Sequence, residues 1–537
     1  MQKKAIKVNS TDNVVVALMD LNAGEIVNVE GIEYEILKHT KAKHKFSAED
    51  LIVGDKIIMY GILVGKANLP IKKGEVITTE NVKHQSAKVE KKTETTSWTP
   101  PNVDKWKNRT FMGYHREDGQ VGTSNTWLFF PLVFCENRNV EILKEVFEKE
   151  LLFEKASKHQ LLLRSLVNNS ETEIVEEDEM DNRVFKNIEV KFITHQGGCG
   201  GIRQDAEALG RLLAGYVKNP NVAGATVLSL GCQNLQIQIF KDALDAISPD
   251  NKKPIIIYEQ QKSGTVDEML NGLIKDSYEA IKQANEVERN PAPISKLVLG
   301  LECGGSDGFS GISANPTLGR LSDLMTAIGG ATILSEFPEL CGVEQELVNR
   351  CVNEEDAVRF LQLMKDFEAS VVAAGSGFDM NPSPGNIRDG LITDAMKSAG
   401  AAKKGGSSPV EDVLDFTEYI KRPGLNLLCT PGNDVECTTA LVGSGANAVL
   451  FTTGLGTPTG NPVVPVVKIS SNTSLAERMP DIIDFNTGEI ITGEKSIDEM
   501  ADELLEFIIE VASGEVKTKA EILQQNDFIP WKRGVSL

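Results

Sequence analysis

The segment LECGGSDGFSGISANPTLGR (residues 301–320) follows an apolar run, Leu297–Leu301, that is typical of a buried strand. It contains five glycines, three serines, two acidic residues and one cysteine. Glycine costs backbone entropy and adds no side chain to a core, so it serves where the backbone must approach another group closely. This dense group of glycines and small polar residues therefore predicts a site for a small ligand or a bound ion.

The same rhythm of apolar strand, glycine-rich loop and amphipathic helix runs through the chain from about residue 109. One helix is predicted after Arg203 and another over Ile497–Ser513, where Gly514 ends it. Continuous apolar runs that alternate with helices indicate an α/β fold with mainly parallel sheets, in which ligands bind at the carboxyl ends of the strands. The predicted strands are Trp127–Phe134, Ile188–Thr194, Ala225–Leu230, Ile255–Tyr258, Leu297–Leu301, Leu425–Cys429 and Ala448–Thr452.

Residues 1–84 have a different pattern, in which a turn leading into a strand recurs. The phrases LNAGEIV (21–27), LIVGDKI (51–57) and PIKKGEVI (70–77) each have this form. They predict a small, mostly β module. Residues 85–108 are polar, contain proline and show no periodicity, so they are predicted to be a linker.

The chain has 537 residues and a formal net charge of −21, so we expect several domains and an acidic surface. That charge argues against nucleic acid or an anionic membrane as a partner, since both require a basic surface. No apolar run approaches the roughly 18 residues of a membrane span. The start, MQKKAIKVNSTDN, has no apolar signal-peptide core, so a cytoplasmic protein is expected.

Three of the eight cysteines, Cys199, Cys232 and Cys303, follow predicted strands and are bordered by glycine. If these strands are parallel neighbours, the thiols project from one edge of a sheet, with His195 and Glu302 on the same loops. Thiolate and imidazole suit iron or zinc, which predicts a metal or cluster site. The alternative is that the cysteines pack as small residues at crowded strand ends. The segment GGCGGIRQDAEALG (197–210) lacks the G-x-G-x-x-G spacing, so nucleotide binding is the weaker interpretation.

In the N-terminal module, KHKFSAEDL (43–51) places His44 between two lysines. Such a histidine is usually an ordinary surface residue. Alternatively, His44 and Lys45 close over the site of another domain, with the imidazole as acid or base and the ammonium as a carboxylate anchor. The loops NPSPGN (381–386), CTPGNDVECTT (429–439) and TTGLGTPTG (452–460) are either turns or sources of N–H and hydroxyl groups for a polyhydroxylated ligand.

Several of these motifs together resemble the altronate/galactarate dehydratase family. They are LECGGSDGFSGISANPTLGR, NPSPGN, PGLNLLCTPGND (423–434), GLGTPTG (454–460), GYHREDGQVGTSN (113–125) and HKF (44–46). The resemblance runs from near residue 5 to the C-terminal GVSL, and it is closer to the altronate branch. It implies a SAF-type β-clip domain over residues 1–84, the linker 85–108, and a two-part α/β catalytic body divided into residues 109–290 and 291–537.

The resemblance implies a hydro-lyase that converts D-altronate to 2-dehydro-3-deoxy-D-gluconate and water. Iron(II) is the implied cofactor, with Mn²⁺ or an iron–sulfur cluster as alternatives. Galactarate is the alternative substrate, and a sugar-acid-binding regulatory protein without catalysis is the alternative function. The implied partner is thus a small sugar acid, and the sequence is compatible with a homo-oligomer. The chain departs from the family pattern where Lys43 replaces a glycine, where Gln233 replaces a common glutamate, and at ITTENVKH (77–84), which replaces an HxHN segment.

The implied reaction determines which residue types the site needs. Dehydration of a 2,3-dihydroxy acid removes a weakly acidic C2 proton and expels a C3 hydroxide, so it needs a base, an acid and a cation that stabilises the enediolate. By the resemblance and the strand-end pattern, the expected residues are His44, Lys45, His195, Glu302 and Asp307 for catalysis, Arg203, Ser306, Asn315 and Asn433 for substrate binding, and Cys199, Cys232 and Cys303 for the metal.

Overall fold

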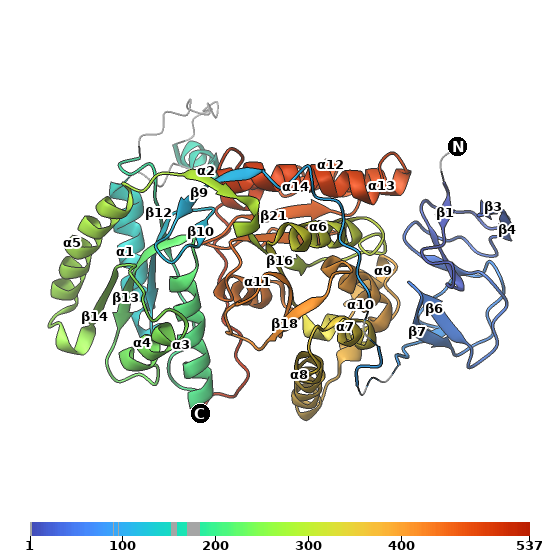
Figure 1. Cartoon of the computed structure of the whole chain (residues 1–537), viewed down its shortest axis with the longest axis horizontal. Helices are drawn as coiled ribbons and strands as arrows, with labels where there is room; N and C mark the ends of the chain where they lie inside the picture. The colour runs from blue at the N-terminus through green and yellow to red at the C-terminus, as the bar shows by residue number, and fades with distance from the viewer. Residues whose placement is uncertain (1–2, 88, 90, 95, 152–157, 169–182) are drawn as a thin grey trace.

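The computed structural model describes residues 3–87, 89, 91–94, 96–151, 158–168 and 183–537, so residues 88, 90 and 95 of the expected linker lie outside it. Figure 1 shows three parts along the long axis of the molecule. A small β module lies at one end, a part built on a four-stranded sheet at the other, and a part built on a seven-stranded sheet between them. The predicted fold class, an α/β protein with a small N-terminal β domain and mainly parallel sheets, is confirmed.

The N-terminal module contains small antiparallel sheets of order β1-β2-β5, β3-β4 and β6-β7-β8. In β3 the burial alternates along IVNV, so Val27 and Val29 point into a small core with Tyr34 and Phe46. The strands are β1 (Ala5–Ile6), β2 (Val14–Ala17), β3 (Ile26–Val29), β4 (Ile32–Glu35), β5 (Lys45–Ser47), β6 (Lys56–Met59), β7 (Ile62–Ala67) and β8 (Val82–Lys83).

The second part is a parallel sheet of order β12-β11-β13-β14 with helices on both faces. In β11, Leu128 and Phe130 pack with α3 and α4, whereas Trp127 and Phe129 pack with α1 and α5. The strands are β11 (Thr126–Pro131), β12 (Glu189–Phe192), β13 (Val222–Ser229) and β14 (Ile255–Glu259). The helices are α1 (Asn137–Glu150), α2 (Lys158–Asn168), α3 (Arg203–Lys218), α4 (Ile237–Ile247) and α5 (Val266–Ala284).

The third part is a parallel sheet of order β18-β19-β17-β16-β20-β21-β22. Helices α6 and α14 cover one face and α11 covers the other. The strands are β16 (Val298–Cys303), β17 (Ala331–Leu334), β18 (Val410–Leu414), β19 (Gly424–Leu428), β20 (Ala448–Thr453), β21 (Val466–Ser470) and β22 (Phe485–Asn486). The helices are α6 (Ala314–Ile328), η4 (Phe337–Leu340), α7 (Glu344–Arg350), α8 (Glu354–Ala373), α9 (Pro384–Arg388), α10 (Asp394–Ala401), η6 (Ala402–Gly405), α11 (Asp434–Gly443), α12 (Thr473–Arg478), α13 (Glu489–Thr492), α14 (Ile497–Ser513) and α15 (Lys519–Ile522).

A small sheet ties the two α/β parts together. Strand β9 (Thr110–His115) pairs with β10 (Val121–Gly122) and, antiparallel, with β15 (Asn290–Pro293). The second part therefore begins and ends at the same place, beside the seven-stranded sheet. Within the described residues, no helix combines the length and the apolar character that a membrane span requires.

The contact between α3 and α11 holds the two α/β parts together and yields a prediction. A Cβ atom at Gly215 of α3 would lie 2.0 Å from the carbonyl oxygen of Gly443 on α11. In an isolated helix, alanine is favoured over glycine by about 1 kcal/mol. Here we expect the opposite, because backbone atoms cannot make room. Gly215→Ala should lower the thermal midpoint in calorimetry by about 2–6 °C.

The matched control is Gly385→Ala in α9, where the added atom would make only van der Waals contacts of 3.7 and 3.8 Å. This variant should unfold at the temperature of the unmodified chain or slightly above it, because alanine is the better helix former. A Gly215→Ala chain that is as stable as the control would show that α3 and α11 are not in close contact.

Candidate active site

The polar loops of the seven-stranded sheet leave from one edge of it. Strand β16 ends at Cys303, β20 at Thr453 and β21 at Ser470, and all three strands are parallel. Two groups of charged and polar side chains gather at this edge. The Asp307 cluster comprises Lys43, Asp307, Ser310, Asp389, Ser471 and Asn472. The Cys303 cluster comprises Glu302, Cys303, Glu336, Glu339, Lys397 and Lys404.

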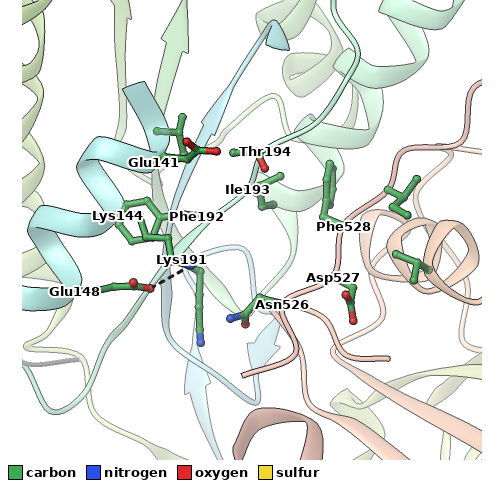
Figure 2. A pocket seen from close by; sticks show the side chains of 13 residues that line it. Glu141, Lys144, Glu148, Lys191, Phe192, Ile193, Thr194, Asn526, Asp527 and Phe528 are labelled. Atoms are coloured by element: carbon green, nitrogen blue, oxygen red, sulfur yellow. Dashed lines mark ion pairs between the residues drawn. The ribbon is translucent and has the colours of Figure 1, made fainter. Parts of the chain in front are cut away.

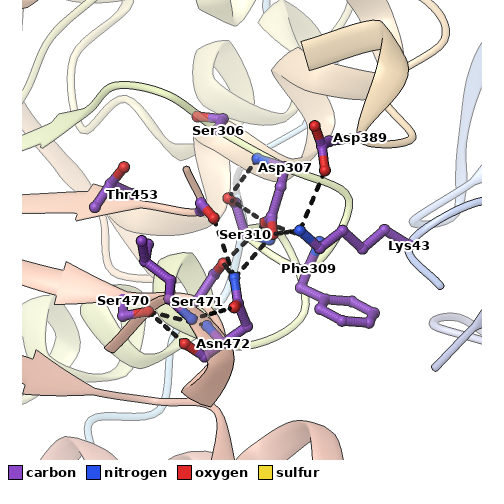
Figure 3. Close-up of polar contacts among 12 residues, drawn as sticks. Lys43, Ser306, Asp307, Phe309, Ser310, Asp389, Thr453, Ser470, Ser471 and Asn472 are labelled. Carbon is purple, nitrogen blue, oxygen red and sulfur yellow. Dashed lines mark hydrogen bonds and ion pairs between the residues drawn. The ribbon is translucent and has the colours of Figure 1, made fainter. Parts of the chain in front are cut away.

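The Asp307 carboxylate is fully buried, and both of its oxygens accept several hydrogen bonds (Figure 3). Oδ1 accepts from the backbone N–H groups of Phe309 (3.1 Å) and Ser310 (2.9 Å) and from the hydroxyls of Ser310 (3.0 Å) and Ser471 (2.8 Å). Oδ2 accepts from Asn472 Nδ2 at 3.1 Å and lies 2.9 Å from Lys43 Nζ. Asp307 thus joins the loop after β16, the end of β21 and the N-terminal module.

Residues 43–45 of the N-terminal module lie against the loop that follows α9. Lys43 Nζ is 3.3 Å from Asp389 Oδ1, and Lys45 Nζ donates to the Gly390 carbonyl at 2.7 Å. The Nε2 of His44 lies 3.1 Å from the Arg388 carbonyl. Since a carbonyl can only accept, Nε2 carries the proton and Nδ1 keeps its lone pair.

Two glycines allow the module to approach this closely. A Cβ atom at Gly308 or at Gly390 would lie 2.3 Å from the Lys43 carbonyl oxygen in both cases. Lys43 itself has a φ of +75°, in the left-handed region that favours glycine. This explains why the family pattern has glycine at this position, and it shows that the chain retains the backbone conformation with a charged side chain added.

Burial acts to lower the pKa of all three residues, but the neighbouring acids reverse the net shift at Lys43. Burial lowers the pKa of His44, so the imidazole is neutral at pH 7. It lowers the pKa of Lys45 to about 7, although Asp307 acts in the opposite direction. Burial also opposes the charge on Lys43, but Asp307 and Asp389 outweigh it and raise the pKa of that ammonium.

The Cys303 cluster is buried and densely charged. Lys404 Nζ is 2.8 Å from the Cys303 Sγ and also contacts the Glu336 carboxylate. The same Sγ lies 3.5 Å from a carboxylate oxygen of Glu336 and 3.5 Å from one of Glu339. Glu339 is in turn paired with Lys397 at 2.5 Å. Two ammonium groups therefore compensate two carboxylates around the thiol.

The electrostatics of this cluster separate its acids. Burial, reinforced by the Glu336 carboxylate, raises the pKa of Glu302 well above its usual range, so this group is a neutral carboxylic acid at pH 7. Burial opposes ionisation of Glu339 too, but Lys397 and Lys404 outweigh it and lower the pKa of that carboxyl. One Glu302 oxygen, Oε1, has no hydrogen-bond partner among the described residues. The site therefore holds a neutral acid beside an ionised one.

The Cys303 cluster could hold a divalent metal ion. Cys303, Glu336 and Glu339 each offer a ligand atom, and these atoms lie within 4.8 Å of one another. A thiolate with two carboxylates is a mixed donor set that iron(II) or zinc accepts. The Lys404 ammonium contacts two of the same groups, which shows that they attract a cation. The residues present fit a metal ion that would take over these contacts.

The structure does not bring the three cysteines expected at the metal together. Cys303 ends β16 in the seven-stranded sheet, whereas Cys199 and Cys232 follow β12 and β13 in the four-stranded sheet. The loops of Cys199 and Cys232 do touch, since the N–H of Leu235 donates to the Gly198 carbonyl at 3.0 Å. Among the described residues, neither shares a ligand group with Cys303. The expectation of one common edge was wrong, because the three strands belong to two sheets.

His195 and Arg203 belong to the four-stranded sheet as well. The Nε2 of His195 donates to the Pro131 carbonyl at 2.7 Å, and its Nδ1 accepts from the Gly197 N–H at 3.1 Å. Burial lowers the pKa of His195 to about 4. A neutral ring with both nitrogens bonded to the backbone positions a loop, so the catalytic role expected for His195 is not supported. Arg203 is exposed at the start of α3.

The remaining expected substrate-binding residues have local bonding roles. The Ser306 carbonyl accepts from Asn386 Nδ2 at 2.7 Å, at the site edge. Asn315 uses both ends of its amide, donating to the Gly400 carbonyl and accepting from the Thr452 hydroxyl. Asn433 caps α11. Ser306 and Asn315 are buried, whereas Asn433 is exposed.

Sequence reasoning missed much of the Cys303 cluster. Glu336 and Glu339 follow β17, a strand that was not predicted, and Lys404 comes from AAKKGG (401–406). Glu336 has a φ of +64°, a left-handed conformation that is costly for a glutamate and is typical of functional sites. The signal that could have revealed these residues was the pair of acids in SEFPEL (335–340), directly after the apolar ATIL.

A separate pocket of about 370 Å³ lies in the second part, between α1, β12 and residues 526–529 (Figure 2). Its lining mixes lysines with acids, and Lys144 Nζ lies 3.9 Å from Glu148. None of the lining residues belongs to the Asp307 or the Cys303 cluster. The neutral and ionised acids and the histidine gather at the other sheet, which therefore carries the candidate active site.

Acids, lysines and a histidine at the carboxyl edge of a parallel sheet define an enzyme site for a small polar ligand. Family models match most of the chain: an altronate/galactarate dehydratase SAF domain over residues 3–85, a D-galactarate dehydratase/altronate hydrolase second domain over 113–285, and a D-galactarate/altronate dehydratase C-terminal domain over 294–536. The chain belongs to the altronate/galactarate dehydratase family, a family of hydro-lyases. The resemblance seen in the sequence is confirmed.

Characterised relatives cover nearly the full chain. It is 36% identical over 543 residues to the altronate dehydratase of Bacillus subtilis (strain 168), with 100% of both chains covered. It is 34% identical to the altronate dehydratase of Escherichia coli (strain K12), with 99% of each chain covered. It is 32% identical to the galactarate dehydratase (L-threo-forming) of the same strain, with 96% of this chain and 93% of the relative covered.

The buried Asp307 predicts a stability difference between two neighbouring carboxylates. In Asp307→Asn, an NH₂ group, itself a donor, would replace one oxygen and would face hydrogen-bond donors. The Lys43 ammonium would also lose its buried counter-ion. We expect a loss of about 3 kcal/mol, seen as a lower midpoint in urea unfolding. The control is Asp389→Asn, whose carboxylate is 32% exposed and should contribute less than about 1 kcal/mol. Equal losses of unfolding free energy in the two variants would contradict the role of Asp307 as the main buried counter-ion of Lys43.

Proposed function

We propose that the chain is a metal-dependent sugar-acid dehydratase that converts D-altronate to 2-dehydro-3-deoxy-D-gluconate and water. The observation that carries the proposal is the meeting of His44 and Lys45 with the Asp307 edge of the seven-stranded sheet. At this edge, the imidazole of His44 and the ammonium of Lys45 come from the N-terminal module. They lie beside the buried acids of the seven-stranded part. The similarity to two altronate dehydratases over their full length supports the same reaction.

His44 is suited to remove the C2 proton. Its Nε2–H is held by the Arg388 carbonyl, so the ring orientation is fixed and the lone pair lies on Nδ1. The lowered pKa keeps the ring neutral and therefore basic at pH 7. The C2 proton moves to Nδ1, the C3–O bond breaks, and the resulting enol becomes the 2-keto product.

The leaving hydroxide needs a proton, and the substrate carboxylate needs a cation. Glu302 is the buried neutral acid of the site and can supply the proton, giving water. In the structure, Lys45 donates to the Gly390 carbonyl, which carries no charge. A substrate carboxylate would be a stronger acceptor for this ammonium and would replace that contact. We assign substrate anchoring to Lys45 in its protonated form.

The metal proposal rests on the donor set of the Cys303 cluster. Iron(II) held by Cys303, Glu336 and Glu339 would supply positive charge that stabilises an enediolate. Manganese(II) and an iron–sulfur cluster are the alternatives. The two lysines of the cluster would keep the net charge of such a site moderate.

The charges at the site favour D-altronate over galactarate, which carries a second carboxylate. Lys43, Lys397 and Lys404 are each paired with an acid of the site. A second substrate carboxylate would have to compete with Asp307, Glu339 or Glu336 for one of these cations. The hydroxymethyl end of altronate requires no such competition.

The assay uses anaerobically purified, iron-reconstituted protein with D-altronate and with galactarate, and it measures the 2-keto product. We expect kcat/KM to be at least tenfold higher for D-altronate, about 1.4 kcal/mol of discrimination. Chelation should abolish turnover, and iron(II) should restore it. A clear preference for galactarate would overturn the substrate assignment. Binding without turnover would favour a sugar-acid-binding regulatory protein.

The depressed pKa of Lys45 predicts a pH dependence of substrate binding. An amine with a pKa of about 7 is protonated below pH 7 and neutral above it. KM should therefore rise about fivefold between pH 7 and pH 8, while kcat follows His44 separately. In Lys45→Arg the guanidinium stays charged, so this rise in KM should disappear.

Lys41→Arg is the control for that experiment, because Lys41 is exposed on the same segment. Its KM should follow the unmodified chain at every pH. An unchanged rise in KM in Lys45→Arg would show that another group anchors the substrate.

A further inference from the structure

A second group of potential metal ligands lies where the N-terminal module meets the seven-stranded part. His84 follows β8, Cys341 follows η4, and Asp394 is the first residue of α10. One ligand atom from each lies within 4.8 Å of the others. The ligand atoms of a tetrahedral zinc site are about 3–4 Å apart, so small side-chain movements would complete the geometry.

Asp394 gives an independent indication that a cation is needed. The residue is 2% exposed, and its Oδ2 accepts no N–H or O–H from the described residues. The Cys341 thiol is the side chain that interacts with this carboxyl. The Oδ1 of Asp394 is reached by the Ser398 hydroxyl at 3.5 Å. A buried carboxyl oxygen that receives no N–H or O–H hydrogen bond is poorly stabilised, so a cation at Oδ2 would be favoured.

Among the described residues, the charged groups that act most strongly on Cys341 are acids. Asp394, Glu344 and Glu368 all place negative charge near its thiol. The lysine that acts on Asp394 is Lys397, and its ammonium is held by Glu339 at 2.5 Å and by Asn381 at 3.0 Å. The lysine that acts on Asp394 is therefore committed elsewhere, and burial disfavours charge on both Asp394 and the Cys341 thiol in the absence of another cation.

We propose that His84, Cys341 and Asp394 bind one divalent transition-metal ion, with zinc as the best match to an imidazole, a thiolate and a carboxylate. Three protein ligands leave a fourth position for water. The Ala395 N–H lies 3.4 Å from His84 Nδ1, a long contact that an ion on this nitrogen would replace. The site is distinct from the Cys303 cluster and shares no ligand with it.

Such an ion would fasten the end of the N-terminal module to the catalytic body. The same interface already contains one polar tie, from the Thr393 hydroxyl to the Val64 carbonyl of β7 at 2.7 Å. His84 is the last residue before the linker expected over residues 85–108. A metal there would hold the module in the position that places residues 43–45 at the Asp307 edge.

The test titrates metal-free, full-length protein with Co²⁺, whose thiolate charge-transfer absorption reports cysteine ligation, and measures bound zinc by mass spectrometry. Cys303→Ser removes the thiol of the other potential ligand group among the described residues. In that background we expect a remaining thiolate–cobalt band that Cys341→Ser abolishes. Cys341→Ser alone should bind about one equivalent of zinc less per chain than the unmodified protein.

His84→Gln and Asp394→Asn should weaken Zn²⁺ binding as well, and His84 lies at a partly exposed position where replacement does not disturb the core. If Cys341→Ser fails to fold, His84→Gln alone decides the question by the same readouts. Cys135→Ser is the control, because this thiol is exposed and belongs to neither ligand group. Equal zinc content and an equal cobalt spectrum in His84→Gln and the unmodified chain would overturn the proposal.

Discussion

The buried carboxylate of Asp307 is the interaction on which the arrangement of the site depends. An ionised group without water must receive hydrogen bonds at both oxygens, and here the donors come from three separate segments. The loop after β16, the end of β21 and Lys43 of the N-terminal module are thereby fixed to one point. Because Lys43 is fixed, His44 and Lys45 are fixed as well. The position of His44 and Lys45, the residues proposed for proton transfer and substrate anchoring, thus follows from the solvation requirement of one carboxylate.

The Cys303 cluster solves a related problem with more charges. Glu336 and Glu339 are buried, and each is compensated by a lysine from the segment 394–405. Among the described residues Glu302 has no ion-pair partner, and it remains protonated because burial and the neighbouring Glu336 carboxylate raise its pKa. The same buried surroundings therefore hold a neutral acid at Glu302 and an ionised carboxylate at Glu339, which Lys397 and Lys404 stabilise. Dehydration needs both kinds of group.

The sequence predicted the strands well where they are buried on both faces, because such strands are continuous apolar runs. All seven predicted strands are present, and α14 has the bounds expected from its periodicity and its terminal Gly514. Strands β17, β18 and β21 were not predicted from the sequence, for physical reasons. Strand β17 is only ATIL, β18 reads VEDVL with acids inside it, and β21 contains the buried Lys468. Short or charged segments give no apolar run, although the sheet buries them.

The candidate site was predictable in part for the same reason. The glycine-rich loop with Glu302, Cys303 and Asp307 was recognisable because it directly follows an apolar strand. The assignment of Cys199 and Cys232 to the same edge failed, because sequence alone does not say which strands share a sheet. Nor could it show that both nitrogens of His195 bond to backbone, since that depends on where Pro131 and Gly197 lie in space.

Two separate constraints act at residue 43, one on its backbone conformation and one on its side-chain charge, although a sequence pattern shows only one position. Its left-handed backbone and the close approach of Gly308 and Gly390 concern the main chain, and glycine satisfies them best. Its ammonium forms an ion pair with Asp307. With glycine at this position, only neutral hydrogen-bond donors would stabilise the charge on Asp307. In this chain the backbone strain of a lysine is offset by an ion pair to a buried acid. The module is therefore held to the catalytic body by charge as well as by shape, at the residue directly before His44, the histidine proposed as the base.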